Sequence, residues 1–348
     1  MGREEVLNST LDKIKKDHGE GSIMWMGDEQ ALEVDVTPSG SLALDIALGA
    51  GGVPRGRIVE IFGKESSGKT TLALHMLAEV HKKDGAAAFV DAEHALDPKY
   101  SKAIGVKLDR LLLSQPNSGE EALEITEKLI RSGALDMVAI DSVAALVPQA
   151  ELEGDMGDSQ VGLQARLMSQ AMRKLAGAIS QSRTTVVFTN QIRSRISNSP
   201  WGPSTTTSGG RALKFYSSLR LNIYITKTLE RNNEKIGNST TVRVVKNKVA
   251  PPFKEASFDI IYGKGISRAR ELVDLGEEYD IVERNGSWYS YGDTKLGQGM
   301  DNCQEFLEEN EQIAEEIERK IRKTAGLRVG DSDSDSSDDE STEEESDE

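Results

Sequence analysis

Apolar residues along this chain follow two periodicities that alternate from residue 57 onward. Short, nearly continuous apolar runs are typical of buried strands, and an apolar residue at every third or fourth position is typical of a helix. The expected strands cover 57–63, 86–94, 136–142 and 184–191, and two expected helices cover 70–83 and 160–182. Strands that alternate with helices predict an α/β fold, with a parallel sheet covered by helices.

The pattern changes on both sides of this region. Three closely spaced strand-like runs predict antiparallel additions to the same sheet, at 219–228, 240–249 and 256–263. From 268 to 326, short helical stretches and a Gly/Tyr-rich patch indicate a small separate lobe. Near the N-terminus, residues 3–17 predict a helix with one apolar stripe, Leu7, Leu11 and Ile14. That stripe needs a covering surface, from its own domain or from a neighbouring subunit.

The formal net charge of −16 is concentrated at the C-terminus. Residues 331–348 hold eleven of the 58 acidic residues and no basic or apolar one, and the rest of the chain carries a charge of only about −5. Such a block cannot bury enough apolar surface to become ordered, so we expect a disordered tail. It is either a solubilising tail or a mobile polyanion that competes with DNA for basic surfaces.

Other compositional features exclude several classes of protein. The single cysteine, Cys303, excludes an intramolecular disulfide framework and fits a reducing compartment. No apolar run approaches the length that spans a membrane, and the N-terminus has no apolar signal core. We therefore expect a cytoplasmic protein without a membrane partner.

A glycine-rich segment separates the first expected strand from the helix that follows it. Residues 63–71, GKESSGKTT, fit the pattern G-x-x-x-x-G-K-[ST]. Glycines let the backbone turn its N–H groups toward phosphate oxygens, the lysine reaches the β- and γ-phosphates, and the hydroxyl that follows it ligates Mg²⁺. The alternative is a glycine turn without a ligand. The predicted phosphate site consists of Gly63, Lys64, Glu65, Ser66, Ser67, Gly68, Lys69, Thr70 and Thr71.

Two further strand ends supply polar groups for the same site. Asp141 ends an apolar run, where a P-loop enzyme needs a second Mg²⁺ group beside Thr70, and Ser142 follows it. Another strand ends in Glu93 and His94. We assign water activation to Glu93, because a carboxylate is the better base beside a γ-phosphate. The alternatives are a loop-capping role for Asp141 and a structural role for His94.

Two segments are candidates for DNA contact, although the second is acidic and is a poor direct binder of phosphate. Residues 191–215 are rich in Ser, Thr, Gly and Pro and carry three arginines, which predicts a long mobile loop suited to phosphates, or a solvent loop without function. Residues 151–162 are acidic and read as a surface loop, followed by Arg166 and Arg173 on a helix. Lys246 and Lys248 alternate near a strand end, so we expect both ammonium groups on one face, next to an anion.

The combined motifs resemble the bacterial-type RecA recombinases. The motifs are GKESSGKTT, VDAEHALDPKY, AIDSVAALVP, MSQAMRKLAG, NQIR, TTTSGGRALKFY, VVKNKVAPPFK and WYSYGDTKLGQG, and they occur in the order and at the spacings of that family over residues 3–326. The resemblance implies a RecA-type P-loop ATPase that forms a helical filament on single-stranded DNA with ATP and Mg²⁺. Such proteins pair the bound strand with homologous double-stranded DNA, exchange strands in recombinational repair, and stimulate self-cleavage of a LexA-type repressor.

The resemblance also implies roles for single residues. Gln191 would sense the γ-phosphate, and Lys246 and Lys248 would reach the nucleotide of the neighbouring protomer. The base would lie against Asp97, Tyr100, Tyr262 and Gly263. Phe215 would lie at the protomer interface. Two loops, near 153–161 and 192–211, would bind DNA through Val161, Arg166, Arg173, Arg193, Ile196, Gly209, Gly210 and Arg211.

Four segments follow from the resemblance. Residues 1–32 would dock on the next protomer through a helix and a strand, 33–267 would form the ATPase core, 268–328 the small C-terminal lobe, and 329–348 the acidic tail. The sequence departs from the family at Lys64, where proline is frequent, at Met300, where lysine is frequent, and in a 192–211 loop one residue longer and containing Trp201. Two rival hypotheses remain open: a ring-forming helicase, and a regulatory protein with a vestigial ATPase.

Overall fold

The computed structural model describes residues 2–19, 22–23, 25, 34–155, 162–194 and 205–327. The expectations for Val161, Ile196, Trp201 and the acidic tail concern positions outside these residues. The chain divides into two units, residues 1–35 and 36–348. The first unit contains helix α1 (Arg3–His18), which agrees with the helix expected there; the strand expected before residue 33 is not among the described residues.

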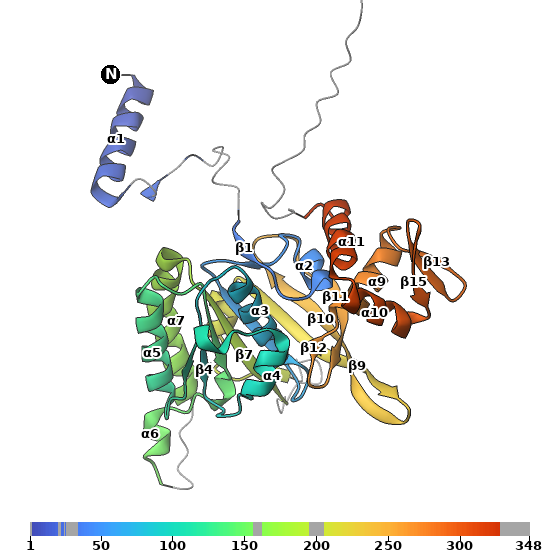
Figure 1. The fold of residues 1–348 in the computed structure, drawn as a ribbon. Coiled ribbons are helices and arrows are strands. Elements are labelled where there is room, and N and C mark those ends of the chain that lie inside the picture. The colour runs from blue at the N-terminus through green and yellow to red at the C-terminus, as the bar shows by residue number, and fades with distance from the viewer. Residues whose placement is uncertain are drawn as a thin grey trace, which may run out of the picture. The chain divides into compact units, whose positions relative to one another are not determined.

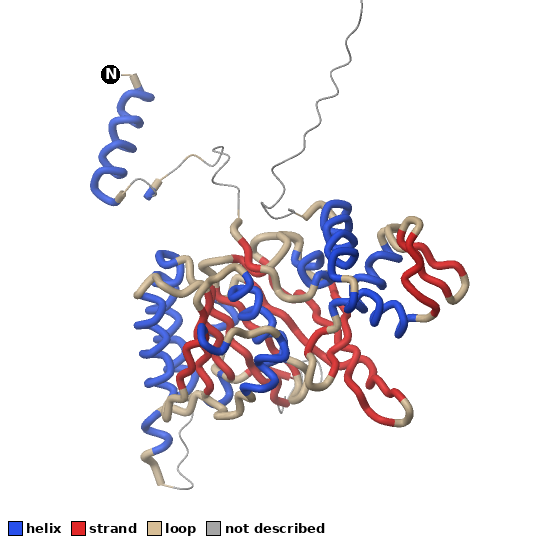
Figure 2. Tube along the Cα trace, in the orientation of Figure 1, coloured by secondary structure: helices blue, strands red, loops and turns tan. Residues whose placement is uncertain are grey.

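A ten-stranded sheet forms the centre of the second unit (Figures 1 and 2). Nine strands lie side by side in the order β12-β11-β10-β9-β3-β7-β6-β4-β5, and β8 pairs with β7. Their bounds are β3 (Ile58–Gly63), β4 (Ala87–Asp91), β5 (Leu111–Ser114), β6 (Met137–Asp141), β7 (Thr185–Ser194), β8 (Thr205–Thr207), β9 (Leu219–Arg231), β10 (Glu234–Asn247), β11 (Glu255–Ile261) and β12 (Gly265–Ile266). A separate pair consists of β1 (Val36–Thr37) and β2 (Val53–Pro54).

The sheet is mainly parallel, as the alternation of strands and helices predicted. β5, β4, β6, β7, β3 and β9 run parallel, and β10, β11 and β12 continue the sheet antiparallel. The prediction for the last strands was therefore wrong for β9, because this strand pairs with β3 in the parallel sense. The chain reaches β9 through β8 and α8 (Ala212–Tyr216), which form a crossover rather than a hairpin.

Helices cover both faces of the sheet (Figure 1). Alternate residues of a strand point to opposite faces, so Val59 and Ile61 pack into one apolar core and Ile58 into the other. The first core contains α3 (Lys69–Lys82), and the second contains α5 (Gly119–Arg131) and α7 (Leu163–Ser182). The remaining helices of this part are α2 (Leu42–Leu48), α4 (Pro98–Ile104), η3 (Leu108–Arg110), η4 (Val143–Ala145) and α6 (Gln149–Leu152).

The C-terminal lobe has its own apolar core. Its elements are α9 (Arg268–Glu278), β13 (Glu283–Asn285), β14 (Trp288–Tyr291), β15 (Thr294–Gln298), α10 (Met300–Glu309) and α11 (Glu311–Thr324). The three strands form an antiparallel sheet, and Leu272, Leu307 and Ile317 are among the buried side chains beneath it. Leu42 of α2 belongs to the same cluster, so this core extends beyond the lobe to the part of the chain that carries the large sheet.

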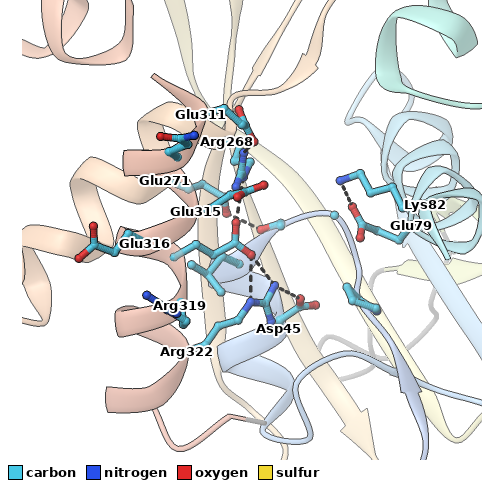
Figure 3. A pocket seen from close by; sticks show the side chains of 16 residues that line it. Asp45, Glu79, Lys82, Arg268, Glu271, Glu311, Glu315, Glu316, Arg319 and Arg322 are labelled. Atoms are coloured by element: carbon cyan, nitrogen blue, oxygen red, sulfur yellow. Dashed lines mark hydrogen bonds and ion pairs between the residues drawn. The ribbon is translucent and has the colours of Figure 1, made fainter. Parts of the chain in front are cut away.

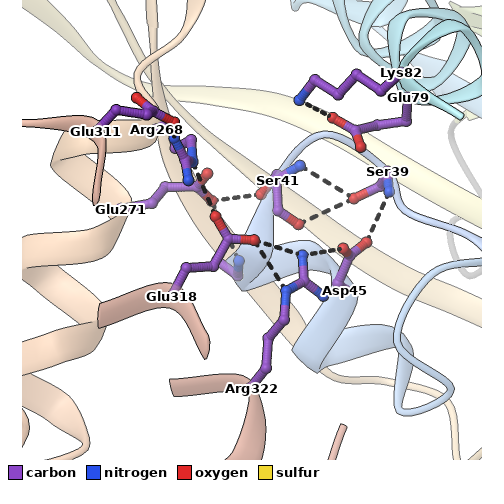
Figure 4. A network of polar contacts seen from close by, with 11 residues as sticks. Ser39, Ser41, Asp45, Glu79, Lys82, Arg268, Glu271, Glu311, Glu318 and Arg322 are labelled. Carbon is purple, nitrogen blue, oxygen red and sulfur yellow. Dashed lines mark hydrogen bonds and ion pairs between the residues drawn. The ribbon is translucent and has the colours of Figure 1, made fainter. Parts of the chain in front are cut away.

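Charged side chains join the lobe to α2 (Figures 3 and 4). They line a cleft of about 760 Å³. Arg322 on α11 contacts Glu318 at 2.9 Å and Asp45 of α2 at 3.5 Å, and the Ser41 hydroxyl donates a 2.5 Å hydrogen bond to Glu271 on α9. Burial raises the pKa of Asp45 to about 7 and that of Glu271 to about 8, despite these partners. Both carboxyl groups are thus poised to titrate near neutral pH.

No helix within the described part of the chain has the length and apolar character needed to cross a membrane.

Candidate ATP and DNA site

The glycine-rich segment lies where the sequence predicted it, between β3 and α3. Gly68 is the residue before α3 and has φ 97°, a conformation that L side chains rarely adopt. A Cβ atom there would also lie 2.5 Å from Ile260 Cδ1. The tight turn leaves the first N–H groups of α3 without helical partners, which is the geometry that binds phosphate at a helix N-terminus.

Lys69 opens α3 and is buried. Its Nζ atom donates a 2.7 Å hydrogen bond to the carbonyl oxygen of Lys64 in the same loop. Burial lowers the pKa of this ammonium group, and the neighbouring Asp141 and Glu93 carboxylates oppose that shift. Among the described residues, this is the one hydrogen bond that holds the ammonium group against the loop. An anion bound over the loop could therefore replace the Lys64 carbonyl as its partner.

Thr70 and Asp141 place oxygen atoms together at the end of β6. The Thr70 hydroxyl donates to Asp141 Oδ2 at 2.5 Å, and the Thr189 hydroxyl donates to Asp141 Oδ1 at 2.5 Å. Burial raises the pKa of Asp141, whereas both hydroxyl groups lower it. Mg²⁺ prefers hard oxygen ligands and keeps several waters, so a hydroxyl and a carboxylate at the phosphate loop fit this ion.

Glu93 and Gln191 meet at the ends of two strands. Glu93 follows β4, and Gln191 lies on β7, directly beside Gly63 in the register of β3. Gln191 Nε2 donates to Glu93 Oε1 at 3.3 Å, and the Ser142 hydroxyl donates to the same oxygen at 2.5 Å. His94, the residue after Glu93, adopts a positive φ of 53°. The structure thus brings together five of the predicted side chains, Lys69, Thr70, Glu93, Asp141 and Gln191.

A pocket of about 210 Å³ continues from the phosphate loop toward β10 and β11. Tyr100 of α4 contacts Thr71 Oγ1 through its hydroxyl at 3.0 Å, and Tyr262 lies across the pocket, where its hydroxyl accepts from Asn238 at 3.0 Å. Asp97 caps α4, and Gly263 follows β11; neither lines the pocket. The lining consists of Ser66, Ser67, Gly68, Lys69, Thr70, Thr71, Tyr100, Asn238, Thr240, Ile260 and Tyr262.

Three of these residues were not predicted: Asn238, Thr240 and Ile260. Asn238 and Ile260 are cross-strand partners on β10 and β11, and Thr240 lies two residues farther along the same face. The hydroxyl of Thr240 is buried without a hydrogen-bond partner among the described atoms. The sequence offered one signal for these residues, because Ile260 lies two positions before the predicted Tyr262. Asn238 and Thr240 could be connected with Ile260 only once the pairing of β10 with β11 was known.

The segment predicted as one long mobile loop is partly ordered. Residues 205–207 form β8, which pairs with β7, and residues 212–216 form α8. The prediction was wrong there because threonines suit a strand and backbone pairing overrides the polar composition. Gly209 has φ 78°, its N–H donates to Gln164 Oε1 at 3.2 Å, and a Cβ atom would lie 2.8 Å from Val143 Cγ1. Gly210 is similarly close to Ala165.

The predicted DNA-contacting arginines are exposed. Arg166 and Arg173 lie seven residues apart on α7, which places them on one face of the helix. Arg193 lies on β7 opposite Thr206, and Arg211 precedes α8. Along the chain, α7 follows the candidate loop near 153–161, and β7 and α8 flank the candidate loop near 192–211.

Lys246 lies on β10, and Lys248 lies one residue beyond the end of this strand at Asn247. The Lys248 N–H donates to the Ser218 carbonyl oxygen at 3.0 Å, directly after the last residue pair of β10 with β9. Lys246 Nζ donates to the carbonyl oxygens of Lys214 and Phe215 at 2.7 and 3.0 Å. Burial, followed by the nearby Lys248, lowers the pKa of Lys246. The Phe215 side chain is 69% exposed.

Comparison with known proteins gives one family. Residues 5–267 match the RecA N-terminal domain, and residues 270–326 match the RecA C-terminal domain. The chain is 60% identical over 325 residues to Protein RecA of Caldanaerobacter subterraneus subsp. tengcongensis, which covers 93% of this chain and 95% of that protein. It is 57% identical over 331 residues to Protein RecA of Oceanobacillus iheyensis, with 95% of each covered, and 58% identical over 324 residues to Protein RecA of Symbiobacterium thermophilum, with 92% of each covered.

The matches span both the region of the large sheet and the C-terminal lobe. They argue against the rival hypothesis of a ring-forming helicase. The chain therefore belongs to the RecA family of DNA-dependent ATPases and homologous recombinases.

Proposed function

We propose that Thr70, Asp141, Glu93 and Gln191 form the hydrolytic centre through which this recombinase couples ATP to DNA. The protein is a single-stranded-DNA-dependent ATPase of DNA repair that uses ATP and Mg²⁺ and pairs the bound strand with homologous duplex. Two hydrogen-bonded pairs support the assignment, Thr70 with Asp141 and Gln191 with Glu93. The two pairs are linked because Ser142, the residue that follows Asp141, donates a hydrogen bond to Glu93.

Each side chain has a distinct task in this proposal. Thr70 and Asp141 hold Mg²⁺, which neutralises charge on the phosphates. Lys69 exchanges the Lys64 carbonyl for a phosphate oxygen at little cost, because its ammonium already faces the loop. Glu93 accepts the proton of the attacking water, and the hydroxyl of Ser142 holds this carboxylate in place.

The base-side pocket and the assembly surfaces complete the proposal. Tyr100 stacks on the base inside the pocket with Tyr262 across from it, and Asp97 and Gly263 approach the base from outside the pocket lining. Phe215 lies at the contact between protomers of a filament, and Lys246 and Lys248 reach the neighbouring nucleotide. The loops near 153–161 and 192–211 bind DNA, with Val161 and Ile196 as wedges between bases and Arg166, Arg173, Arg193, Gly209, Gly210 and Arg211 near the strand.

Segment boundaries and cellular roles belong to the same proposal. Residues 1–32 dock on the next protomer, 33–267 form the ATPase core, 268–328 the lobe and 329–348 the tail. The filament stimulates a LexA-type repressor to cleave itself in the SOS response. The free, buried thiol of Cys303 supports a cytoplasmic location, where thiols stay reduced.

The decisive experiment measures ATP hydrolysis with and without single-stranded DNA. Glu93→Gln removes the base and keeps the shape, so we expect turnover with DNA to fall by about 10²–10⁴-fold while nucleotide binding is retained. His94→Asn is the matched control, because asparagine tolerates the positive φ at that position. Loss of turnover in His94→Asn but not in Glu93→Gln would reassign the base to His94.

A further inference from the structure

A carboxylate lies buried in the centre of the sheet. Glu60 on β3 has no exposed surface, although its neighbours along the strand are apolar. Its strand is flanked by β7 and β9, and Arg220 is its direct partner on β9. Burying a charge is strongly unfavourable unless the charge is fully paired. An apolar side chain would fill this position more cheaply, so Glu60 calls for an explanation beyond packing.

Both carboxylate oxygens of Glu60 are occupied by different donors. Oε2 accepts from Arg220 Nε at 2.5 Å, and Oε1 accepts from Asn190 Nδ2 at 2.9 Å. The Arg220 guanidinium lies 4.6 Å from the centre of the Phe62 ring, which holds it over the strand. The carboxylate therefore joins a fixed cation on one side to a neutral amide on the other.

Asn190 connects this carboxylate to both functional regions. Its Nδ2 group also donates to the carbonyl oxygen of Ser208 at 3.1 Å, at the C-terminal end of the 192–211 loop. Its Oδ1 atom accepts from the backbone N–H of Gln191 at 2.9 Å. Both amide hydrogens and the amide oxygen are thus used. Through Asn190, the orientation of one amide fixes Ser208 and Gln191 together.

We propose that Glu60 is a positioning residue that couples the nucleotide site to the DNA-binding loop by orienting the amide of Asn190. Gln191 in turn donates to Glu93, so the chain of contacts runs from Glu60 to the proposed base. The inference rests on the proposed roles of Gln191 and of the 192–211 loop. Glu60 does not line the nucleotide pocket and is not exposed to solvent. Its influence on the nucleotide site therefore acts through its contact with Asn190.

Glu60→Gln tests this coupling with little change in shape. A glutamine places one oxygen and one NH₂ group where glutamate has two oxygens, so only one of the two donors still faces an acceptor. Arg220 is the charged and therefore the stronger donor, so we expect the oxygen to face Arg220 and the NH₂ group to face Asn190. The amide of Asn190 then loses its fixed orientation, and Ser208 and Gln191 can move independently. A purely structural role would instead lower stability and DNA affinity under all conditions.

The measurement is the dissociation constant for single-stranded DNA with and without a non-hydrolysable ATP analogue. The ratio of the two constants is the coupling between the sites. We expect Glu60→Gln to reduce this ratio by about tenfold, which is a loss of about 1.4 kcal/mol of coupling, and to leave the nucleotide-free constant unchanged. Glu255→Gln is the matched control, since Glu255 makes an exposed 3.5 Å contact with Arg243 in the same sheet.

A second variant, Asn190→Ala, tests the same inference in case Glu60→Gln does not fold. Asn190→Ala keeps the Glu60–Arg220 pair and removes the link to Ser208, so it should reduce the ratio to the same extent. The double variant should be no worse than either single variant, because both act in one path. A wild-type ratio retained by a folded Glu60→Gln or Asn190→Ala would overturn the inference. A wild-type chain without nucleotide-dependent DNA affinity would overturn the proposed function itself.

Discussion

The titration of Glu271 gives a prediction whose sign runs against ordinary expectation. Glu271 is fully buried on α9, and its Oε1 atom accepts from the Ser41 hydroxyl and from the Ala43 N–H (Figure 4). Glu271→Gln retains an oxygen in this position and cannot ionise. Substitution inside a buried polar network usually destabilises a protein, but here we expect the variant to become the more stable form as the pH rises.

The magnitude follows from the pKa of the buried carboxyl group. Burial raises this pKa from 4.5 to about 8, so folding at pH 7 requires a carboxyl that is ionised in the unfolded chain to take up a proton. Each unit between pH and the unfolded pKa costs about 1.4 kcal/mol, which gives about 3 kcal/mol at pH 7 and about 1 kcal/mol at pH 5. The stability that Glu271 contributes is full below pH 4.5 and is lost as the pH rises toward 8.

Urea unfolding at pH 5 and pH 7, followed by circular dichroism, measures the effect. The stability of Glu271→Gln relative to wild type should rise by about 2 kcal/mol between the two pH values, and any pH-independent cost of the amide cancels in that difference. Two protein concentrations separate folding from self-association. The control is Glu283→Gln, an exposed residue of the same lobe. An equal difference at both pH values would refute the assignment of a neutral buried carboxyl.

Two further predictions concern acid stability and the tail. His75 accepts the Ile266 N–H at 2.8 Å, and burial lowers its pKa to about 4, so wild type should lose about 2 kcal/mol relative to His75→Gln as the pH falls from 7 to 5, measured by urea unfolding. Deletion of residues 331–348 should lower the Mg²⁺ concentration needed for strand exchange, since the acidic tail would no longer compete with DNA for basic surface; an unchanged Mg²⁺ profile would contradict this.

The parts of the site that could be predicted are those encoded by consecutive residues. Residues 63–71 carry the proposed phosphate loop in one stretch, and Glu93 and Asp141 stand at the ends of apolar runs that any parallel sheet brings to one edge. Asn238 and Thr240 could not be predicted, because their place in the pocket depends on how β10 pairs with β11. A shift of one residue in that pairing would turn both side chains to the other face.

Glu60 is a second example of what the sequence alone can and cannot predict. A glutamate inside the apolar run IVEIFG is a visible signal that the strand has a polar task. Its partners, however, lie 130 and 160 residues away on β7 and β9, and both of those strands also pair with other strands. The sequence therefore marks the residue that needs an explanation, and only the order of the strands supplies the explanation.

Lys246 connects the single chain to its proposed assembly. An ammonium group has three hydrogen-bond donors, and among the described residues Lys246 uses two of them on the carbonyl oxygens of Lys214 and Phe215. A third bond to a neighbouring phosphate would leave both of these contacts intact. The same ammonium would then hold the last turn of α8, which presents the exposed Phe215 side chain, while it contacts the nucleotide across the interface. Protomer contact and nucleotide contact would therefore form together, which gives a physical reason for filament assembly to depend on ATP.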